Sequence, residues 1–134
     1  MDKQRILLID DEAAFTRVLK SYLEKTGRYE VRMENSGTDA AEIARAFRPD
    51  LILLDIIMPD VDGARVAEAI KDDVRLQHIP VVFLTAVASR DEVYAHGGMI
   101  GGQCFLAKPV SAKDVLARIE LELGAVQKGE QPGA

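Results

Sequence analysis

Short apolar runs that end abruptly at polar residues place the strongest limit on the fold of this chain. Continuous apolar runs of this length are typical of strands buried on both faces of a parallel sheet. Four such runs occur, at residues 6–9, 51–54, 81–84 and 104–107. A fifth segment, residues 29–33, alternates apolar and polar residues as a half-exposed edge strand does. The sequence therefore predicts five strands.

Apolar residues at helical spacing fill the gaps between these strands. The spacing predicts helices over residues 14–23, 40–47, 64–76 and 111–124. Gly27 stands where the first helix would end, and Ser36 or Thr38 would cap the second. Ser111 would open the last helix and Gly124 would close it. A short fourth helix is expected within residues 88–103, although four glycines in that stretch oppose helix formation.

This alternation of strands and helices predicts one architecture. It implies an α/β fold in which a doubly wound parallel sheet carries helices on both faces. In such sheets the ligand site lies beyond the carboxyl ends of the strands. The residues that end the strands are therefore the place to look for chemistry.

Composition and charge exclude several classes of protein. The chain has 134 residues, which fits one domain, and its net charge of −5 argues against a direct nucleic-acid or membrane binder. Cys104, the single cysteine, rules out an internal disulfide or a multi-cysteine zinc site and is expected to be buried in a strand. His78 and His96 have no partner at ligand or catalytic spacing and are predicted at the surface.

The sequence also predicts the domain boundaries and the cellular location of the protein. We expect a domain over residues 1–124 and a flexible tail or linker over residues 125–134, because the tail has no periodicity. No apolar run approaches the ~20 residues of a membrane helix, and the first residues do not form a signal peptide. A cytoplasmic location is expected.

Five polar residues end these apolar strands. Asp10 and Asp11 follow the first strand, Asp55 the third, Thr85 the fourth and Lys108 the fifth. A parallel sheet would bring them to one edge. Three carboxylates there would repel one another unless a cation such as Mg²⁺ shared the site.

The combination of groups indicates phosphoryl transfer. A cation, an ammonium and a hydroxyl around a carboxylate make such a site, with Asp55 able to form an aspartyl phosphate. Taken singly, each residue has an ordinary explanation. An Asp after a strand usually belongs to a turn or caps a helix, and Asp11 or Glu12 could cap the first helix. The combination at successive strand ends favours a site.

Over about residues 4–124 the sequence resembles the receiver domain of two-component response regulators. The resemblance is carried by Asp10-Asp11, by Leu53 to Pro59 followed by Asp62-Gly63, by Thr85-Ala86 and by Lys108-Pro109. It implies a flavodoxin-like, five-stranded parallel sheet of order 2-1-3-4-5 with five helices.

The resemblance also implies the roles of the site residues. Asp55 would be the phosphorylation site, and Asp11 and Asp55 would bind Mg²⁺ together with the main-chain carbonyl of Ile57. Asp10 would act on the metal largely through water. Thr85 and Lys108 would hold the phosphoryl oxygens.

Two further pairs of residues follow from the same resemblance. Thr85 and Phe105 would form the switch that responds to phosphorylation. Ile57 and Val87 would line the path of the hydrolytic water. Both are apolar and cannot orient a water molecule, so a long-lived aspartyl phosphate is expected.

The function implied is that of a phosphoacceptor domain in a bacterial two-component phosphorelay, rather than an enzyme. The donor would be the phosphohistidine of a sensor histidine kinase or phosphotransfer protein. Self-phosphorylation would depend on Mg²⁺, and autodephosphorylation would be slow. The output would pass to an unknown protein target or an output domain outside this sequence. A monomer or a weak, phosphorylation-dependent dimer is expected.

Two other classes of protein could present such a site. A phosphatase of the haloacid-dehalogenase type also forms an aspartyl phosphate, but it needs a second Asp two residues after the nucleophile. Ile57 stands there for Asp55, and Glu12 for Asp10. A flavodoxin-like flavin binder needs small hydroxylic residues after the first strand, where Asp10, Asp11 and Glu12 would repel a phosphate.

Overall fold

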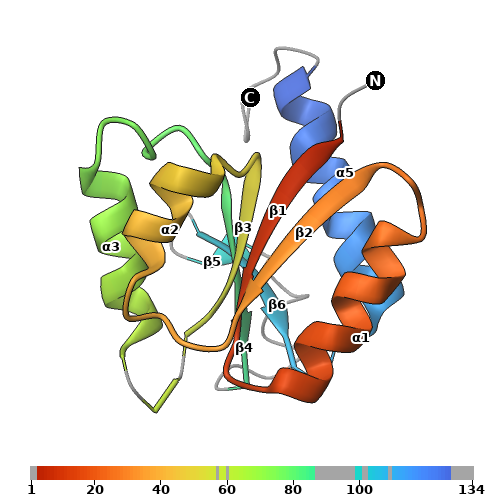
Figure 1. Cartoon of the computed structure of the whole chain (residues 1–134), viewed down its shortest axis with the longest axis horizontal. Helices are drawn as coiled ribbons and strands as arrows, with labels where there is room; N and C mark the ends of the chain where they lie inside the picture. Colours follow the sequence, from red (N-terminus) through yellow and green to blue (C-terminus); the bar gives the residue numbers. More distant parts are fainter. Residues whose placement is uncertain are drawn as a thin grey trace.

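The predicted parallel sheet is present in the structure, a computed structural model that describes residues 3–56, 58–59, 61–86, 99–100, 103–108 and 110–127. Its five parallel strands are β1 (Gln4–Ile9), β2 (Tyr29–Glu34), β3 (Leu51–Asp55), β4 (Val81–Thr85) and β6 (Gln103–Ala107). They lie in the order β2-β1-β3-β4-β6, as Figure 1 shows. This confirms the order 2-1-3-4-5 of a flavodoxin-like fold.

A short sixth strand was not predicted. Strand β5 (Met99–Ile100) pairs antiparallel with β6, with Met99 opposite Cys104. In the sequence these two apolar residues stand between two pairs of glycines, a pattern that suits an extended segment better than a helix. The fourth helix is expected within residues 88–103, of which residues 88–98 and 101–102 lie outside the described residues and the other three belong to β5 and β6.

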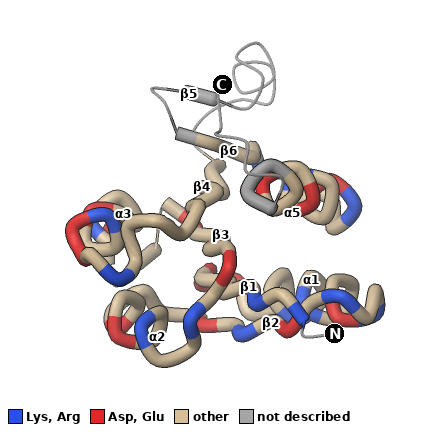
Figure 2. The backbone as a smooth tube through the Cα atoms, turned by 90° about the horizontal axis from the view of Figure 1, so that it is seen from above, with Lys and Arg blue, Asp and Glu red and all other residues tan. Residues whose placement is uncertain are grey.

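Helices cover both faces of the sheet. Helices α1 (Ala13–Glu24) and α5 (Ala112–Gln127) lie on one face, and α2 (Ala40–Phe47) and α3 (Gly63–Asp72) lie on the other (Figure 2). Among the described residues, no helix has the length and apolar character needed to cross a membrane.

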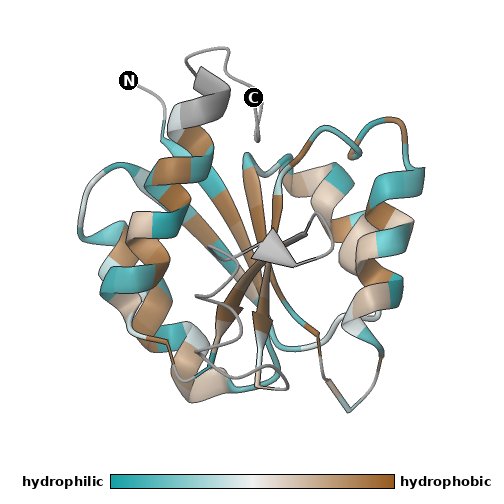
Figure 3. Ribbon diagram, turned by 180° about the vertical axis from the view of Figure 1, so that it is seen from behind, coloured by the Kyte–Doolittle hydropathy of each residue, from teal (hydrophilic) through white to brown (hydrophobic). Residues whose placement is uncertain are grey.

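Alternate residues of the central strands build two separate cores. On β1, Ile6 and Leu8 pack on the side of α1 and α5, whereas Leu7 and Ile9 pack on the side of α2 and α3. All four side chains are fully buried, as the apolar central strands in Figure 3 suggest. A strand apolar at every position is therefore fixed at the centre of the sheet. By contrast, edge strand β2 buries only alternate residues at its start, as predicted.

The start of α2 and the end of α3 differ from the prediction. Ser36 and Thr38 hydrogen-bond to each other, and Asp39 takes the N-cap position of α2 without a side-chain hydrogen bond. Helix α3 ends at Asp72 rather than near residue 76, because the Asp73 side chain accepts a hydrogen bond from the main-chain N–H of Arg75 at 2.8 Å. Such local bonds compete with the helix.

Of the other predicted helix ends, those at Gly27 and Ser111 agree with the structure and the one at Gly124 does not. Gly27 does follow α1 and takes the positive φ of 77° that the prediction requires. Ser111 opens α5 by accepting a hydrogen bond from the N–H of Asp114 at 3.1 Å. Helix α5 runs on to Gln127, so Gly124 does not end it. Gly124 has open space around it, and a glycine inside a helix costs only about 1 kcal/mol relative to Ala.

The start of α3 packs directly on the end of β3. The N–H of Gly63 donates to the carbonyl of Ile56 at 2.8 Å. A Cβ atom at Gly63 would overlap the carbonyl oxygen of Asp55 and stand 2.6 Å from the Ile56 Cα atom. Only the missing side chain allows this approach, which fixes the backbone around Asp55.

Replacing Gly63 should therefore destabilise the protein. Gly63→Ala forces backbone atoms apart, and we expect the free energy of unfolding to fall by about 2 kcal/mol or more. Urea denaturation followed by circular dichroism measures it. Gly124→Ala is the matched control, because it adds a methyl group in open space and should raise stability by up to about 1 kcal/mol. Equal stability of Gly63→Ala and the wild type would contradict this packing.

Candidate functional site

Four strand ends meet at one edge of the sheet. Asp10 follows β1, Asp55 ends β3, Thr85 ends β4 and Lys108 follows β6. The register places Asp55 beside Leu84, and Thr85 beside Ala107. Asp10, Asp55 and Thr85 are all buried. Burying polar groups is unfavourable because they lose their contacts with water. Their concentration at one edge of the sheet therefore indicates a functional role rather than a packing role.

Main-chain hydrogen bonds hold these residues in place. The N–H of Asp10 donates to the carbonyl of Glu34 at 3.0 Å, and the Asp10 carbonyl accepts from Asn35 Nδ2 at 2.8 Å. The N–H of Lys108 donates to the carbonyl of Thr85 at 2.7 Å. The side chains at this edge therefore start from backbone positions that the sheet itself fixes.

The Lys108 ammonium links the acidic residues. Its Nζ atom lies 2.7 Å from Asp10 Oδ2, 2.6 Å from Glu12 Oε1 and 3.3 Å from Asp55 Oδ2. The same atom lies 5.3 Å from the ring centroid of Phe15. The side chain of Lys108 is only 12% exposed and that of Asp10 is fully buried.

These contacts determine the charge of Lys108. Burial by itself lowers the pKa of the ammonium, but the hydrogen bonds to Asp10 and Glu12 and the charges of Asp10 and Asp55 outweigh it. The net effect raises the pKa above the ordinary lysine value. Lys108 therefore stays protonated across the physiological pH range.

The carboxylates of Asp10, Asp11 and Asp55 form a cluster that fits a divalent cation. Each offers one oxygen, and these oxygens lie within 4.8 Å of one another. Asp11 is exposed at the mouth of the cluster. The Lys108 ammonium contacts the carboxylates of Asp10, Glu12 and Asp55, and Asp11 adds a fourth negative charge to the cluster, so negative charge is in excess. Hard oxygen donors with such an excess suit a small hard cation.

The structure brings together most of the predicted site. Asp10, Asp11, Asp55 and Lys108 meet, and Thr85 ends the adjoining strand. Ile57 and Val87, the predicted lifetime-tuning pair, lie outside the described residues, as does His96.

Three other predicted residues are placed by the structure. Phe105 is half-buried and stacks on Phe83, with ring centroids 5.1 Å apart. Cys104 is buried as expected, and burial raises the pKa of its thiol to about 11. His78 is exposed, as predicted, but it lines a pocket far from the acidic cluster.

Glu12 is a member of the site that sequence reasoning did not assign. In the sequence it stands as a possible helix cap and as a negative charge that would repel a flavin phosphate. It does occupy the N-cap position of α1, but its side chain makes no capping hydrogen bond and binds Lys108 instead. The signal in the sequence was a third acidic residue directly after Asp10 and Asp11.

Comparison with known proteins gives one consistent result. Residues 6–120 match the family described as the response regulator receiver domain. The polar-differentiation response regulator DivK of Brucella anthropi is 35% identical over 120 residues, which cover 89% of this chain and 95% of that protein. DivK of Brucella ovis is equally similar.

Solved structures share the fold. A CheY-like response regulator receiver domain protein from Methanospirillum hungatei superposes with a TM-score of 0.79 at 26% identity, covering 96% of this chain and 99% of that one. The signal receiver domain of a signal transduction histidine kinase from Syntrophus aciditrophicus has a TM-score of 0.75 at 31% identity, covering 92% of each chain.

Removing the Lys108 ammonium should destabilise the folded state. Lys108→Met leaves the buried Asp10 carboxylate without its counter-charge, and breaking such a pair costs about 3 kcal/mol. Urea unfolding without divalent cations measures it. Lys113→Met, at an exposed lysine of α5, is the control and should change stability by less than about 0.5 kcal/mol. If both variants unfold like the wild type, the ion pairs of Lys108 do not support the fold.

Proposed function

The chain belongs to the receiver-domain family of response regulators, and from this we propose that Asp55 accepts a phosphoryl group from a phosphohistidine. The observation that carries the proposal is the buried Asp55 carboxylate, 3.3 Å from the Lys108 ammonium and within 4.8 Å of the oxygens of Asp10 and Asp11. A receiver domain is a signalling domain. We propose that it takes up one phosphoryl group and that a target protein recognises the phosphorylated form. Self-phosphorylation would depend on Mg²⁺, and autodephosphorylation would be slow.

The proposed transfer needs few protein groups. A carboxylate oxygen of Asp55 forms a bond to phosphorus while the bond from phosphorus to the donor's imidazole nitrogen breaks, and the imidazole leaves with the electron pair. Lys108 stays protonated and stands beside Asp55, so it can offset negative charge on the phosphoryl oxygens. Thr85, at the end of the adjoining strand, supplies a hydroxyl to the same oxygens.

We propose Mg²⁺ as the cation of the acidic cluster. Asp11 and Asp55 would bind it directly with the main-chain carbonyl of Ile57, and Asp10 would act largely through water. When bound, Mg²⁺ stabilises the charge that develops on the phosphoryl oxygens. The oxygen-only donor set and its excess negative charge support this assignment.

The switch is proposed to involve Thr85 and Phe105. Thr85 would move toward the phosphoryl group, and Phe105 would fill the space that it leaves. The Phe105 ring stacks on Phe83 and is half-buried, so a rearrangement there would alter the surface near β6. Such a change is a shift between two populated arrangements.

The lifetime of the phosphoryl group is proposed to depend on Ile57 and Val87. Neither side chain can hold a water molecule by hydrogen bonding, and orienting that water is most of what hydrolysis requires. We therefore expect a long-lived aspartyl phosphate that depends on a partner for removal.

The proposed partners are those of a phosphorelay. A sensor histidine kinase or phosphotransfer protein would donate the phosphoryl group in the cytoplasm, and a protein target or output domain would read it. We propose a receiver unit of residues 1–124, a tail of residues 125–134 into which α5 extends as far as Gln127, and a monomer or weak phosphorylation-dependent dimer.

Asp55 should be the only phosphorylation site. Incubation with acetyl phosphate and Mg²⁺ should add one phosphoryl group, seen by mass spectrometry, and Asp55→Asn should abolish it. Asp62→Asn is the control, because Asn also caps helices, and it should be labelled like the wild type. Labelling of Asp55→Asn would refute the assignment, and repeated turnover of a generic phosphate ester would favour a phosphatase.

Binding of Mg²⁺ should depend on Asp11. Asp11→Ala removes one oxygen ligand and one negative charge, so the dissociation constant should rise about tenfold or more. Isothermal titration calorimetry with MgCl₂ measures it. Asp39→Ala is the control, since this exposed carboxylate at α2 lies outside the cluster. Equal affinity in Asp11→Ala and the control would show that Asp11 is not a ligand.

A further inference from the structure

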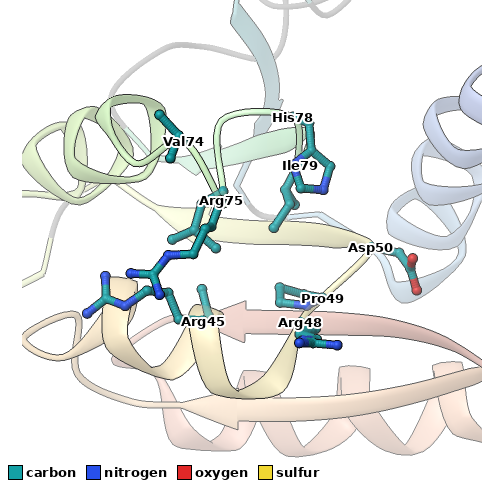
Figure 4. Close-up of a pocket in the computed structure, with 10 residues that line it drawn as sticks. Arg45, Arg48, Pro49, Asp50, Val74, Arg75, His78 and Ile79 are labelled. Carbon is teal, nitrogen blue, oxygen red and sulfur yellow. The ribbon is translucent and has the colours of Figure 1, made fainter.

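A second pocket lies at the opposite end of β3 from the acidic cluster. It encloses about 460 Å³ between the end of α2 and the segment that joins α3 to β4 (Figure 4). Asp50, which precedes β3, lies on its rim. Since β3 advances about 3.3 Å per residue, the pocket is roughly 17 Å from Asp55. Nothing in the proposed phosphoryl transfer uses it.

Three arginines give this pocket a positive charge. Arg45 from α2 and Arg75 from the α3–β4 segment reach toward each other, and Arg48 lies on the connection to β3 (Figure 4). Arg45 and Arg75 share one carboxylate, that of Asp73, at 3.0 and 3.5 Å. Two guanidinium groups thus have one counter-charge between them, in a chain whose net charge is −5.

The third arginine has no counter-charge in the described part of the chain. Within those residues the Arg48 guanidinium forms no hydrogen bond or ion pair. The nearby Asp50 carboxylate accepts a hydrogen bond from the main-chain N–H of Arg5 at 2.7 Å.

Arg48 adopts a backbone conformation that is unfavourable for residues other than glycine, so stability does not explain why an arginine is present there. Arg48 has φ +57° and ψ +61°, at the C-cap of α2. It is the only non-glycine residue with positive φ among those described. Glycine is the usual residue at such a position, and any other L-residue costs roughly 1–2 kcal/mol there. A guanidinium group is held at this pocket in spite of that cost.

The rest of the lining is apolar. Pro49, Leu76 and Ile79 are buried in the wall, and the side chain of Val74 is 77% exposed beside them. A pocket of this volume falls within the range of about 300–1,000 Å³ found for small-molecule sites. Guanidinium groups match the oxygens of phosphate, and they also stack on aromatic rings.

We propose that this pocket binds a small organic phosphate ester. The phosphate would lie against Arg45 and Arg75, whose guanidinium groups lie side by side in Figure 4, and the organic part would extend along Ile79 toward Arg48. The excess of guanidinium groups favours an anion, and the apolar wall favours a ligand larger than a bare inorganic ion. The site is separate from Asp55 and is independent of phosphoryl transfer.

Adenosine 5′-monophosphate is a suitable probe. We expect titration in Mg²⁺-free buffer to shift the amide NMR signals of residues 44–48, 50 and 73–79 in a saturable way. Inorganic phosphate and NaCl at equal ionic strength are the comparison. They should bind at least fivefold more weakly or not at all. Equal responses to all three would mean simple charge screening and would overturn the proposal.

Two variants localise the binding. Arg48→Gly removes the guanidinium and relieves the positive φ, so its melting temperature should equal or exceed that of the wild type. Arg75→Gln removes a second cation at an exposed position. Each should weaken binding of adenosine 5′-monophosphate at least fivefold, whereas Arg17→Gln, on the exposed side of α1, should not. Binding by both pocket variants as tight as in the wild type would overturn the proposal.

Discussion

The Lys108 ammonium allows several carboxylates to share one edge of the sheet. Asp10 is fully buried and Asp55 nearly so, and two such charges close together repel each other strongly. Lys108 Nζ lies within 3.3 Å of an oxygen of each of them, and within 2.6 Å of Glu12. One ammonium does not neutralise all of these carboxylates. The remaining negative charge allows the cluster to bind a divalent cation. One buried cation therefore supports both the fold and the chemistry that we propose at this edge.

The two ends of the sheet carry opposite charge. The carboxyl ends of the strands gather Asp10, Asp11 and Asp55, whereas the α2–β3 and α3–β4 segments at the other end gather three arginines. Strand β3 connects the two ends and is buried along its whole length. This separation keeps the arginines from pairing with the acidic cluster. The two proposed sites therefore differ in charge and in the class of ligand that we assign to each.

The strands and the acidic site were predictable because each strand carries its own signal. A run that is apolar at every position can be stable only at the centre of a sheet, and parallel pairing brings the ends of such runs to one edge. Asp10, Asp55, Thr85 and Lys108 could therefore be grouped without coordinates. Helix ends were less predictable. Asp73 ended α3 early through a bond to Arg75 that competes locally with the helix, and Gly124 did not end α5.

By itself the sequence determined the class of fold, the central strands and the set of residues at their ends, because these follow from hydrophobic periodicity along the chain. Only the tertiary structure decided which partners those residues take. Glu12 meets Lys108 across 96 positions of sequence, and Phe83 meets Phe105 across neighbouring strands. The arginine pocket joins two segments that show no common motif. Contacts of this kind depend on the positions of side chains in space, and periodicity carries no information about them.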